Sequence, residues 1–230
     1  MFRRILGIGL VVLLAAVLFV VGSHAMASAA VDTSATQEPT ARAATDPVDR
    51  SGIAKWAVTN ATWGGWDPMF IGTDCTDFVS RALHFGGGLS EVTPPASQQT
   101  NHDNDRTQWY DDVQVSLSPW LVGSSIRHTY AKTWSEAPWS FQYQLSRGGK
   151  VVPRSAIQVG DIAYVNLHGS SAEGIDHAAI VTKVTATNVY IAQQSNPNQY
   201  SPIFDSTIAA SWQSIYPNMT PFFVDPSAER

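Results

Sequence analysis

Cys75 is the only cysteine in this chain of 230 residues. A single thiol can form no internal disulfide, and it cannot build a cysteine-based zinc cluster. With 44% hydrophobic and only 14% charged residues, the chain also differs from disordered chains and coiled coils, which are rich in charge. We therefore expect a compact globular domain that is held by its apolar core and contains one thiol that needs an explanation.

The N-terminal segment has the pattern of an export signal. Two arginines occur in the first four residues, Ile5 to Gly22 is an uninterrupted apolar run, and small residues follow at Ala25 and Ala27. Residues 1–27 are thus predicted to be a signal peptide. A retained N-terminal membrane anchor is the alternative, because the apolar run approaches the length of a membrane span. In both cases the rest of the chain is exported, secreted or associated with the cell wall.

The charge balance limits the partners of the exported part. The formal net charge is −5, and removing residues 1–27 takes away two arginines and no acid, which leaves −7. Nucleic-acid binding needs clustered Lys and Arg, so nucleic acid is excluded as a partner. An acidic chain is not attracted to anionic lipid head groups, so a membrane is a partner only if the anchor is retained. We expect a monomer.

Residues 28–49 consist of small and polar residues and are predicted to be a flexible linker before a domain at 50–230. Helical spacing of apolar residues predicts a helix from Ile53 to the Gly64-Gly65 pair, and two more over 75–85 and 134–145. Residues 90–118 are rich in Ser, Asn, Asp and Pro and are expected to be a long connection.

Short β-rich segments separated by turn residues fill the C-terminal part of the domain. The predicted strands are Asp161–Asn166, His177–Val184, Asn188–Gln194 and Pro221–Val224. Such spacing favours an antiparallel sheet, and the predicted fold class is α+β.

The position of Cys75 favours a reactive thiol. A lone cysteine in an exported protein is exposed to oxidation, and Cys75 lies at the first turn of a predicted helix, after Thr73 and Asp74. Unpaired backbone N–H groups and the helix dipole stabilise a thiolate there. A buried, inert cysteine is the alternative. We interpret Cys75 as a nucleophile.

His177 is the candidate base among the six histidines. It begins an otherwise small and apolar strand, where an unpartnered polar side chain is costly to bury, although a core histidine with a satisfied partner fits this position too. Gln194 and Asn196 share one face of the following strand by its period of two. Either could fix the tautomer of His177, and we prefer Gln194. If neither does, His168 or Asp176 is the next candidate.

Three segments of the sequence carry a family resemblance. The run Asp74-Cys75-Thr76-Asp77-Phe78-Val79-Ser80-Arg81-Ala82-Leu83 resembles the D-C-T-N-F-V-S-Q-A-L signature of the bacterial putative amidase domain family. The aromatic segment from Trp134 to Leu145, and Gly160-Asp161 followed by His177-Ala178-Ala179-Ile180-Val181-Thr182, are similar to two further blocks of that family, in the same order. The resemblance extends from about residue 50 to about residue 212.

The resemblance implies a papain-like fold related to the CHAP and NlpC-type cell-wall hydrolases, with the cysteine at a helix N-terminus and the histidine on an antiparallel sheet. Asp77 and Arg81 replace the family's Asn and Gln, and their i, i+4 spacing predicts that they pair with each other. Gln194 stands where relatives often carry another polar residue such as His.

The implied function is cleavage of amide bonds, with peptidoglycan or a peptide as substrate and a Cys-His acyl-enzyme mechanism. The backbone N–H of Cys75 is the expected oxyanion donor, with a second donor from the region 63–70. No cofactor or metal is expected, because no histidine pair has metal spacing and the segment 103–106 lacks the glycine and glutamate of a calcium loop. The alternatives are a catalytically silent wall-binding or interaction module and a secreted protease or effector acting on proteins.

Overall fold

The computed structural model describes residues 48–61, 74–117, 124–194 and 203–226. The chain divides into two compact units, Met1–Arg42 and Ala43–Arg230, and all described residues belong to the second. The predicted signal peptide and nearly all of the predicted linker thus lie outside the described residues. Within the described ranges, every helix is too short or too polar to span a membrane.

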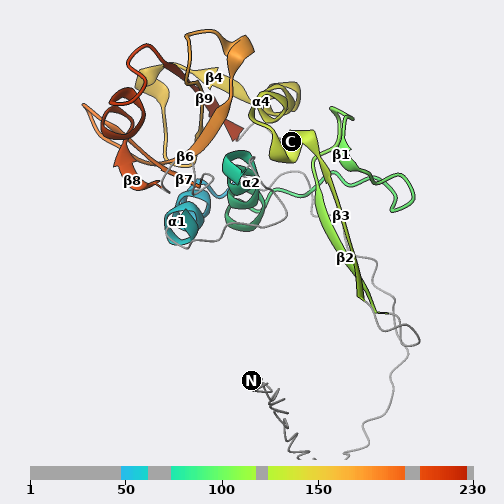
Figure 1. The fold of residues 1–230 in the computed structure, drawn as a ribbon. Helices are drawn as coiled ribbons and strands as arrows, with labels where there is room; N and C mark the ends of the chain where they lie inside the picture. The colour runs from blue at the N-terminus through green and yellow to red at the C-terminus, as the bar shows by residue number, and fades with distance from the viewer. Residues whose placement is uncertain (1–47, 62–73, 118–123, 195–202, 227–230) are drawn as a thin grey trace, which may run out of the picture. The chain divides into compact units, whose positions relative to one another are not determined.

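The second unit contains a six-stranded sheet (Figure 1). Its strand order is β4-β9-β5-β6-β7-β8, and each neighbouring pair is antiparallel. The strands are β4 (Lys150–Val152), β5 (Ile162–Asn166), β6 (His177–Val184), β7 (Val189–Gln193), β8 (Ile203–Thr207) and β9 (Thr220–Asp225). Together with the helices described next, this sheet confirms the predicted α+β class.

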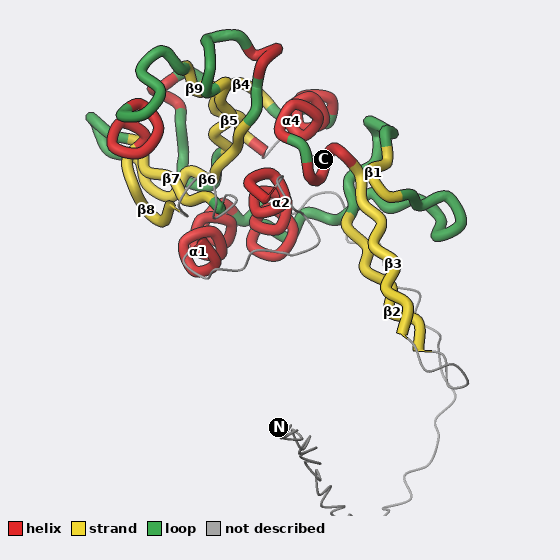
Figure 2. Tube along the Cα trace, in the orientation of Figure 1, coloured by secondary structure: helices red, strands yellow, loops and turns green. Residues whose placement is uncertain are grey.

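The helices stand out from the sheet in the coloured tube of Figure 2. They are α1 (Arg50–Ala61), α2 (Asp74–Arg81), α3 (Lys132–Ser135) and α4 (Ala137–Ser146), with single helical turns at η1 (Ala82–Gly86), η2 (Arg154–Ala156), η3 (Ala172–Gly174) and η4 (Ala209–Gln213). Helices were predicted in all three places where α1, α2 and α4 occur. The predicted helix over 75–85 is in fact α2 followed by the π-helical turn η1.

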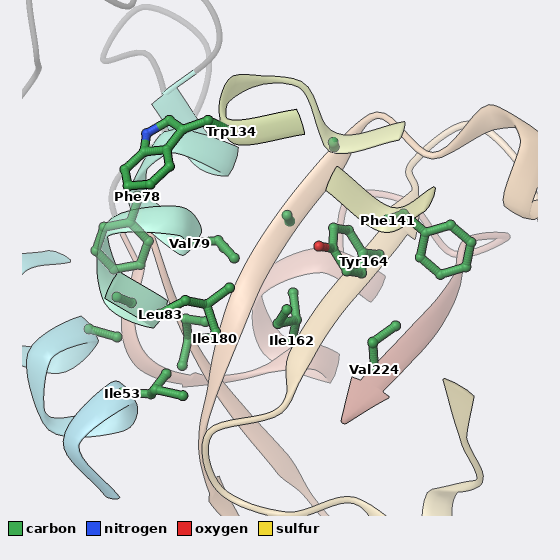
Figure 3. Close-up of a cluster of buried hydrophobic side chains, with 14 of the residues drawn as sticks. Ile53, Phe78, Val79, Leu83, Trp134, Phe141, Ile162, Tyr164, Ile180 and Val224 are labelled. Carbon is green, nitrogen blue, oxygen red and sulfur yellow. The ribbon is translucent and has the colours of Figure 1, made fainter. Parts of the chain in front are cut away.

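Two apolar clusters hold the sheet, one on each face. On the helix side, Phe78 and Leu83 from the α2–η1 segment pack with Ile162, Tyr164 and Ile180 of the sheet (Figure 3). The alternate strand residues point the other way and form a second cluster with Trp212 of η4. Burying one such side chain contributes about 1.5–3 kcal/mol, so both clusters fix the strands, and the helix-side cluster also fixes α2.

The pairing of β6 with β7 contains a β-bulge. On the turn side of the bulge the pairs are Lys183–Tyr190 and Val184–Val189, whereas beyond it they are Ile180–Ala192 and Val181–Ile191. The pairing therefore shifts by one residue between Val181 and Lys183. This shift decides which β7 side chains share a face with the N-terminal end of β6.

Arg50 joins the start of α1 to the sheet. Its guanidinium group binds the carboxylates of Asp161, just before β5, and Asp225 in β9. Gly160 has a φ of +87°, and a Cβ there would lie 2.7 Å from the carbonyl oxygen of Arg50. The Gly-Asp pair is thus explained by the close approach of α1 and by the buried ion pair that it allows.

A second sheet lies in the region that was expected to be a connection. It has the order β1-β3-β2, with β1 (Asn101–Asp103), β2 (Asp111–Leu117) and β3 (Ser124–Ala131). The prediction for residues 90–118 was therefore wrong over β1 and β2. Val113, Val115 and Leu117 alternate with polar residues, which is a strand pattern, and the surrounding Asp, Ser and Asn masked it.

Candidate active site

Cys75 lies in the first turn of α2, and its side chain is partly exposed. Its Sγ atom is 3.6 Å from the hydroxyl oxygen of Thr76 and accepts a hydrogen bond from the backbone N–H of Ala178 in β6. Backbone N–H groups in the first turn of a helix have no intrahelical acceptor. The role of the Cys75 N–H as an oxyanion donor stays a prediction, and the segment 63–70, predicted to supply the second donor, lies outside the described residues.

Buried polar contacts fix α2 behind the thiol. The indole N–H of Trp134 donates to a carboxylate oxygen of Asp77 at 2.6 Å. The Nε atom of Arg81 lies 3.0 Å from the other carboxylate oxygen, so the predicted pairing of Asp77 with Arg81 is confirmed. Ser80 donates its hydroxyl to the backbone carbonyl of Trp134 at 2.8 Å. The two bonds to Trp134 therefore hold the helix against rotation and sliding.

His177 is the first residue of β6, is only 5% exposed, and is hydrogen-bonded to Cys75. The predicted nucleophile and the predicted base thus meet, although they are separated by about a hundred residues of sequence. The strand carries His177 to the N-terminus of α2, because α2 and β6 share one apolar cluster through Val79 and Ile180.

Gln193, at the end of β7, is the partner of the other side of the imidazole ring. Its Oε1 lies 2.7 Å from His177 Nε2 and also 2.7 Å from the indole nitrogen of Trp212. An indole N–H only donates, so the amide oxygen of Gln193 must face both nitrogens. The Nε2 atom of His177 must then carry a proton, which leaves Nδ1 to exchange a proton with Cys75.

The structure brings Gln193 to His177 where Gln194 was the preferred candidate, and the other candidate, Asn196, stays a prediction. The side-chain amide of Gln194 donates to the backbone carbonyl of Asn60 in α1 at 2.8 Å, and Asn196 lies outside the described residues. The physical reason is the β-bulge. Beyond it, the β7 residues that share a face with His177 have odd numbers, so Gln193 lies on that face.

The pKa values of the pair shift in opposite directions, that of the Cys75 thiol downwards and that of the His177 imidazole upwards. Partial burial by itself raises the pKa of the Cys75 thiol, but the charge and hydrogen bond of His177, with smaller help from Thr76 and Ala178, lower it below its ordinary value. Burial by itself lowers the pKa of His177, but the Cys75 thiolate, the Gln193 bond and the charge of Asp176 raise it. The geometry therefore favours a thiolate–imidazolium pair.

A cleft of about 320 Å³ opens at the thiol. Its described lining residues are Cys75, Thr76, Ser135, Glu136, Ala137, Pro138, Ile175 and Asp176. Most of these side chains are small or apolar, so an extended substrate can approach the sulfur. The lining comes from α2, from the α3–α4 junction and from the residues just before β6.

The other histidines that were weighed as bases lie elsewhere. His84 contacts the backbone carbonyl of Leu89 at 2.7 Å, His102 contacts Tyr130, His128 is 2.5 Å from Asp111, and His168 is exposed. Among the described residues, no three His, Cys, Asp or Glu side chains are grouped so that they could hold a metal ion. The segment 103–106 forms a polar turn in which Asp103 accepts the N–H of Asp105.

Most of the tryptophans that the structure describes belong to the core. Trp109, Trp134 and Trp212 are buried, whereas Trp139 is partly exposed beneath the guanidinium group of Arg106. Trp63, Trp66 and Trp120 lie outside the described residues. No feature of the sequence marked Trp212 as a neighbour of the histidine, because its place depends on how η4 folds back onto β7.

The fold and the site together define an α+β protein in which a cysteine and a histidine meet at an open cleft. Residues 50–217 match the sequence model of the putative amidase domain family. The chain belongs to this family and is a hydrolase of the class that acts on amide bonds. No curated protein and no solved structure matches the chain.

Proposed function

We propose that the chain is an exported cysteine amidase that cleaves amide bonds through an acyl-enzyme. The observation that carries this proposal is the contact series from Cys75 to His177 to Gln193, with the pKa of the thiol lowered and that of the imidazole raised. This is the cysteine–histidine–amide order of papain-like enzymes, and the helix-on-sheet layout fits that relationship.

In the proposed reaction, the Cys75 thiolate attacks the carbonyl carbon of the amide in the cleft. The negative oxygen of the tetrahedral intermediate accepts the Cys75 backbone N–H, and the protonated His177 passes its Nδ1 proton to the leaving nitrogen. Water then attacks the thioester with His177 as base, which releases the acid and regenerates the thiol. Gln193 and Trp212 hold the imidazole in one tautomer throughout.

The proposed substrate is a peptide amide bond of cell-wall peptidoglycan. The family resemblance to wall hydrolases supports this choice, and so does the export signal predicted in residues 1–27. We propose that residues 28–49 link this segment to the catalytic domain, residues 50–230. A secreted or wall-associated location gives such an enzyme access to its polymer.

Turnover of purified peptidoglycan by the purified chain, under reducing conditions, tests the proposal. Release of soluble fragments with new amino and carboxyl ends is expected, and Cys75→Ser should release none. Digestion of a denatured protein but not of the wall would favour the secreted protease or effector. An unreactive Cys75, together with binding to the wall and no turnover, would identify a silent module.

A further inference from the structure

Two carboxylates line the cleft beside the thiol. Glu136 lies in the α3–α4 junction and Asp176 directly precedes His177, and both contribute to the same cleft wall as Cys75. No lysine or arginine is among the described lining residues. The thiolate and the imidazolium cancel each other's charge, so the two carboxylates set the sign of the potential that a substrate meets.

Asp176 is held in place by the backbone. One of its carboxylate oxygens accepts the N–H of Leu167 at 3.0 Å. His168 approaches the other oxygen only to 3.9 Å, and its own side chain is 74% exposed. The carboxylate is therefore oriented by the backbone, its charge acts on the neighbouring His177, and among the described residues it has no ion pair with a lysine or arginine.

Glu136 has a distant counter-ion. The ammonium group of Lys132 lies 4.0 Å from its carboxylate and also 5.3 Å from the centre of the Trp139 ring. Both members of the pair are partly exposed, and pairs of this kind contribute little. The backbone of Glu136 is fixed, because its N–H donates to the carbonyl of Lys132 and its carbonyl accepts the N–H of Ser140.

We infer that this cleft selects amides that carry a protonated amine close to the scissile bond, and that Glu136 and Asp176 are the residues that determine this specificity. The inference rests on the proposed function, since it names the class of substrate for the same thiol. An ammonium group between two carboxylates gains charge-assisted hydrogen bonds, whereas an anionic group at the same place is repelled.

The charge of the cleft can be measured on the thiol itself, without any turnover. Methanethiosulfonates convert a thiolate to a mixed disulfide and release methanesulfinate, and Cys75 is the only cysteine that can react. The rate with the cationic 2-aminoethyl reagent is divided by the rate with the anionic 2-sulfonatoethyl reagent, both normalised to a small free thiol. We expect this ratio to be about tenfold in favour of the cation at low salt. The ratio is independent of the intrinsic reactivity of the thiolate.

Variants assign the effect to residues. Glu136→Gln and Asp176→Asn should each lower the ratio by about threefold, and Lys132→Gln should raise it. Glu173→Gln removes the same charge from an exposed residue of η3 that does not line the cleft, and it should leave the ratio unchanged. High salt should shrink the wild-type ratio, which needs no variant to fold. Equal rates for the two reagents, or a ratio that neither cleft variant lowers, would overturn the inference.

Matched peptides separate this inference from the proposed function. An amide substrate with lysine beside the scissile bond should be cleaved with about tenfold higher kcat/KM than the same peptide with norleucine. Cleavage of both peptides at one rate would remove the inference and leave the amidase. No cleavage of any peptide or wall polymer, with the reagent ratio intact, would remove the proposed function and leave the acidic cleft.

Discussion

The helix that carries Cys75 and the strand that carries His177 are each supported by one buried tryptophan whose indole N–H donates to a side-chain oxygen. Behind Cys75, Trp134 donates to Asp77 at 2.6 Å; behind His177, Trp212 donates to Gln193 at 2.7 Å. The donors, the burial and the distances are nearly the same. The acceptors differ, since one is a carboxylate and the other a neutral amide.

The two acceptors differ in the second group that each of them binds. The Asp77 carboxylate also binds Arg81, and both of these contacts support α2. The Gln193 oxygen also accepts from His177, and the Trp212 ring stands at 69° to the imidazole with centres 5.4 Å apart. An indole donor therefore fixes the position of α2 in one region, and in the other it fixes which nitrogen of His177 carries the proton. Substitutions on the two sides should have different readouts.

The largest effect is expected at the thiol itself. Cys75→Ser replaces a nucleophile of lowered pKa by a hydroxyl that the same imidazole cannot ionise, so turnover should fall by at least about a thousandfold. Steady-state hydrolysis measures the loss, and circular dichroism with thermal unfolding should show an unchanged fold. Turnover close to that of the wild type would exclude a cysteine mechanism.

His177→Ala should nearly abolish turnover and also change the titration of the thiol. Without the imidazolium, the burial contribution is left and the pKa of Cys75 rises, so fast alkylation by iodoacetamide should begin only at higher pH. Alkylation rates between about pH 5 and pH 10 measure this shift. If the two rate profiles superimpose, the histidine does not activate the thiol.

Gln193→Ala should slow turnover by about ten- to thirtyfold, the equivalent of losing a bond worth about 1–2 kcal/mol. It also removes a contact that raises the pKa of His177. The imidazolium should then lose its proton at lower pH, and the alkaline limb of the pH–rate profile should shift to lower pH. Gln194→Ala is the matched control, because it removes the neighbouring amide, which donates to the backbone carbonyl of Asn60. A larger effect from Gln194→Ala would reverse the assignment.

The two tryptophans test the comparison directly and should give the smallest changes in rate. Trp134→Phe removes the indole bond to the Asp77 carboxylate, and we expect a loss of about 1–3 kcal/mol in unfolding free energy with little change in the pH profile. Trp212→Phe should lower the rate by a few-fold and shift the pH–rate profile, because the side-chain amide of Gln193 can then rotate and exchange its oxygen and nitrogen positions. Denaturant unfolding and pH–rate profiles of both variants measure this. Equal shifts of the pH–rate profile in both variants would show that the two tryptophans have the same role.

The sequence allowed the helices of the site and four of the six strands of the large sheet to be predicted, because their apolar periodicity is clear. The bounds of β6 agree with the prediction at both ends. The pairing of His177 with Gln193 could not be predicted, because face assignment needs the register and the register changes at a bulge. The hairpin of β2 and β3 was missed because its apolar residues alternate within a polar composition typical of loops.

The bulge between Val181 and Lys183 also affects how sequences of this family should be aligned. If the pairing continued from Val184–Val189 without a bulge, the even-numbered residues of β7 would share a face with His177. Because of the bulge, the odd-numbered residues of β7 share that face. A relative of the same length whose β6 and β7 pair without the bulge would place its acceptor in the column of Gln194. An apparent substitution in these two columns would then record a change of register between β6 and β7, while the acceptor in space stays the same.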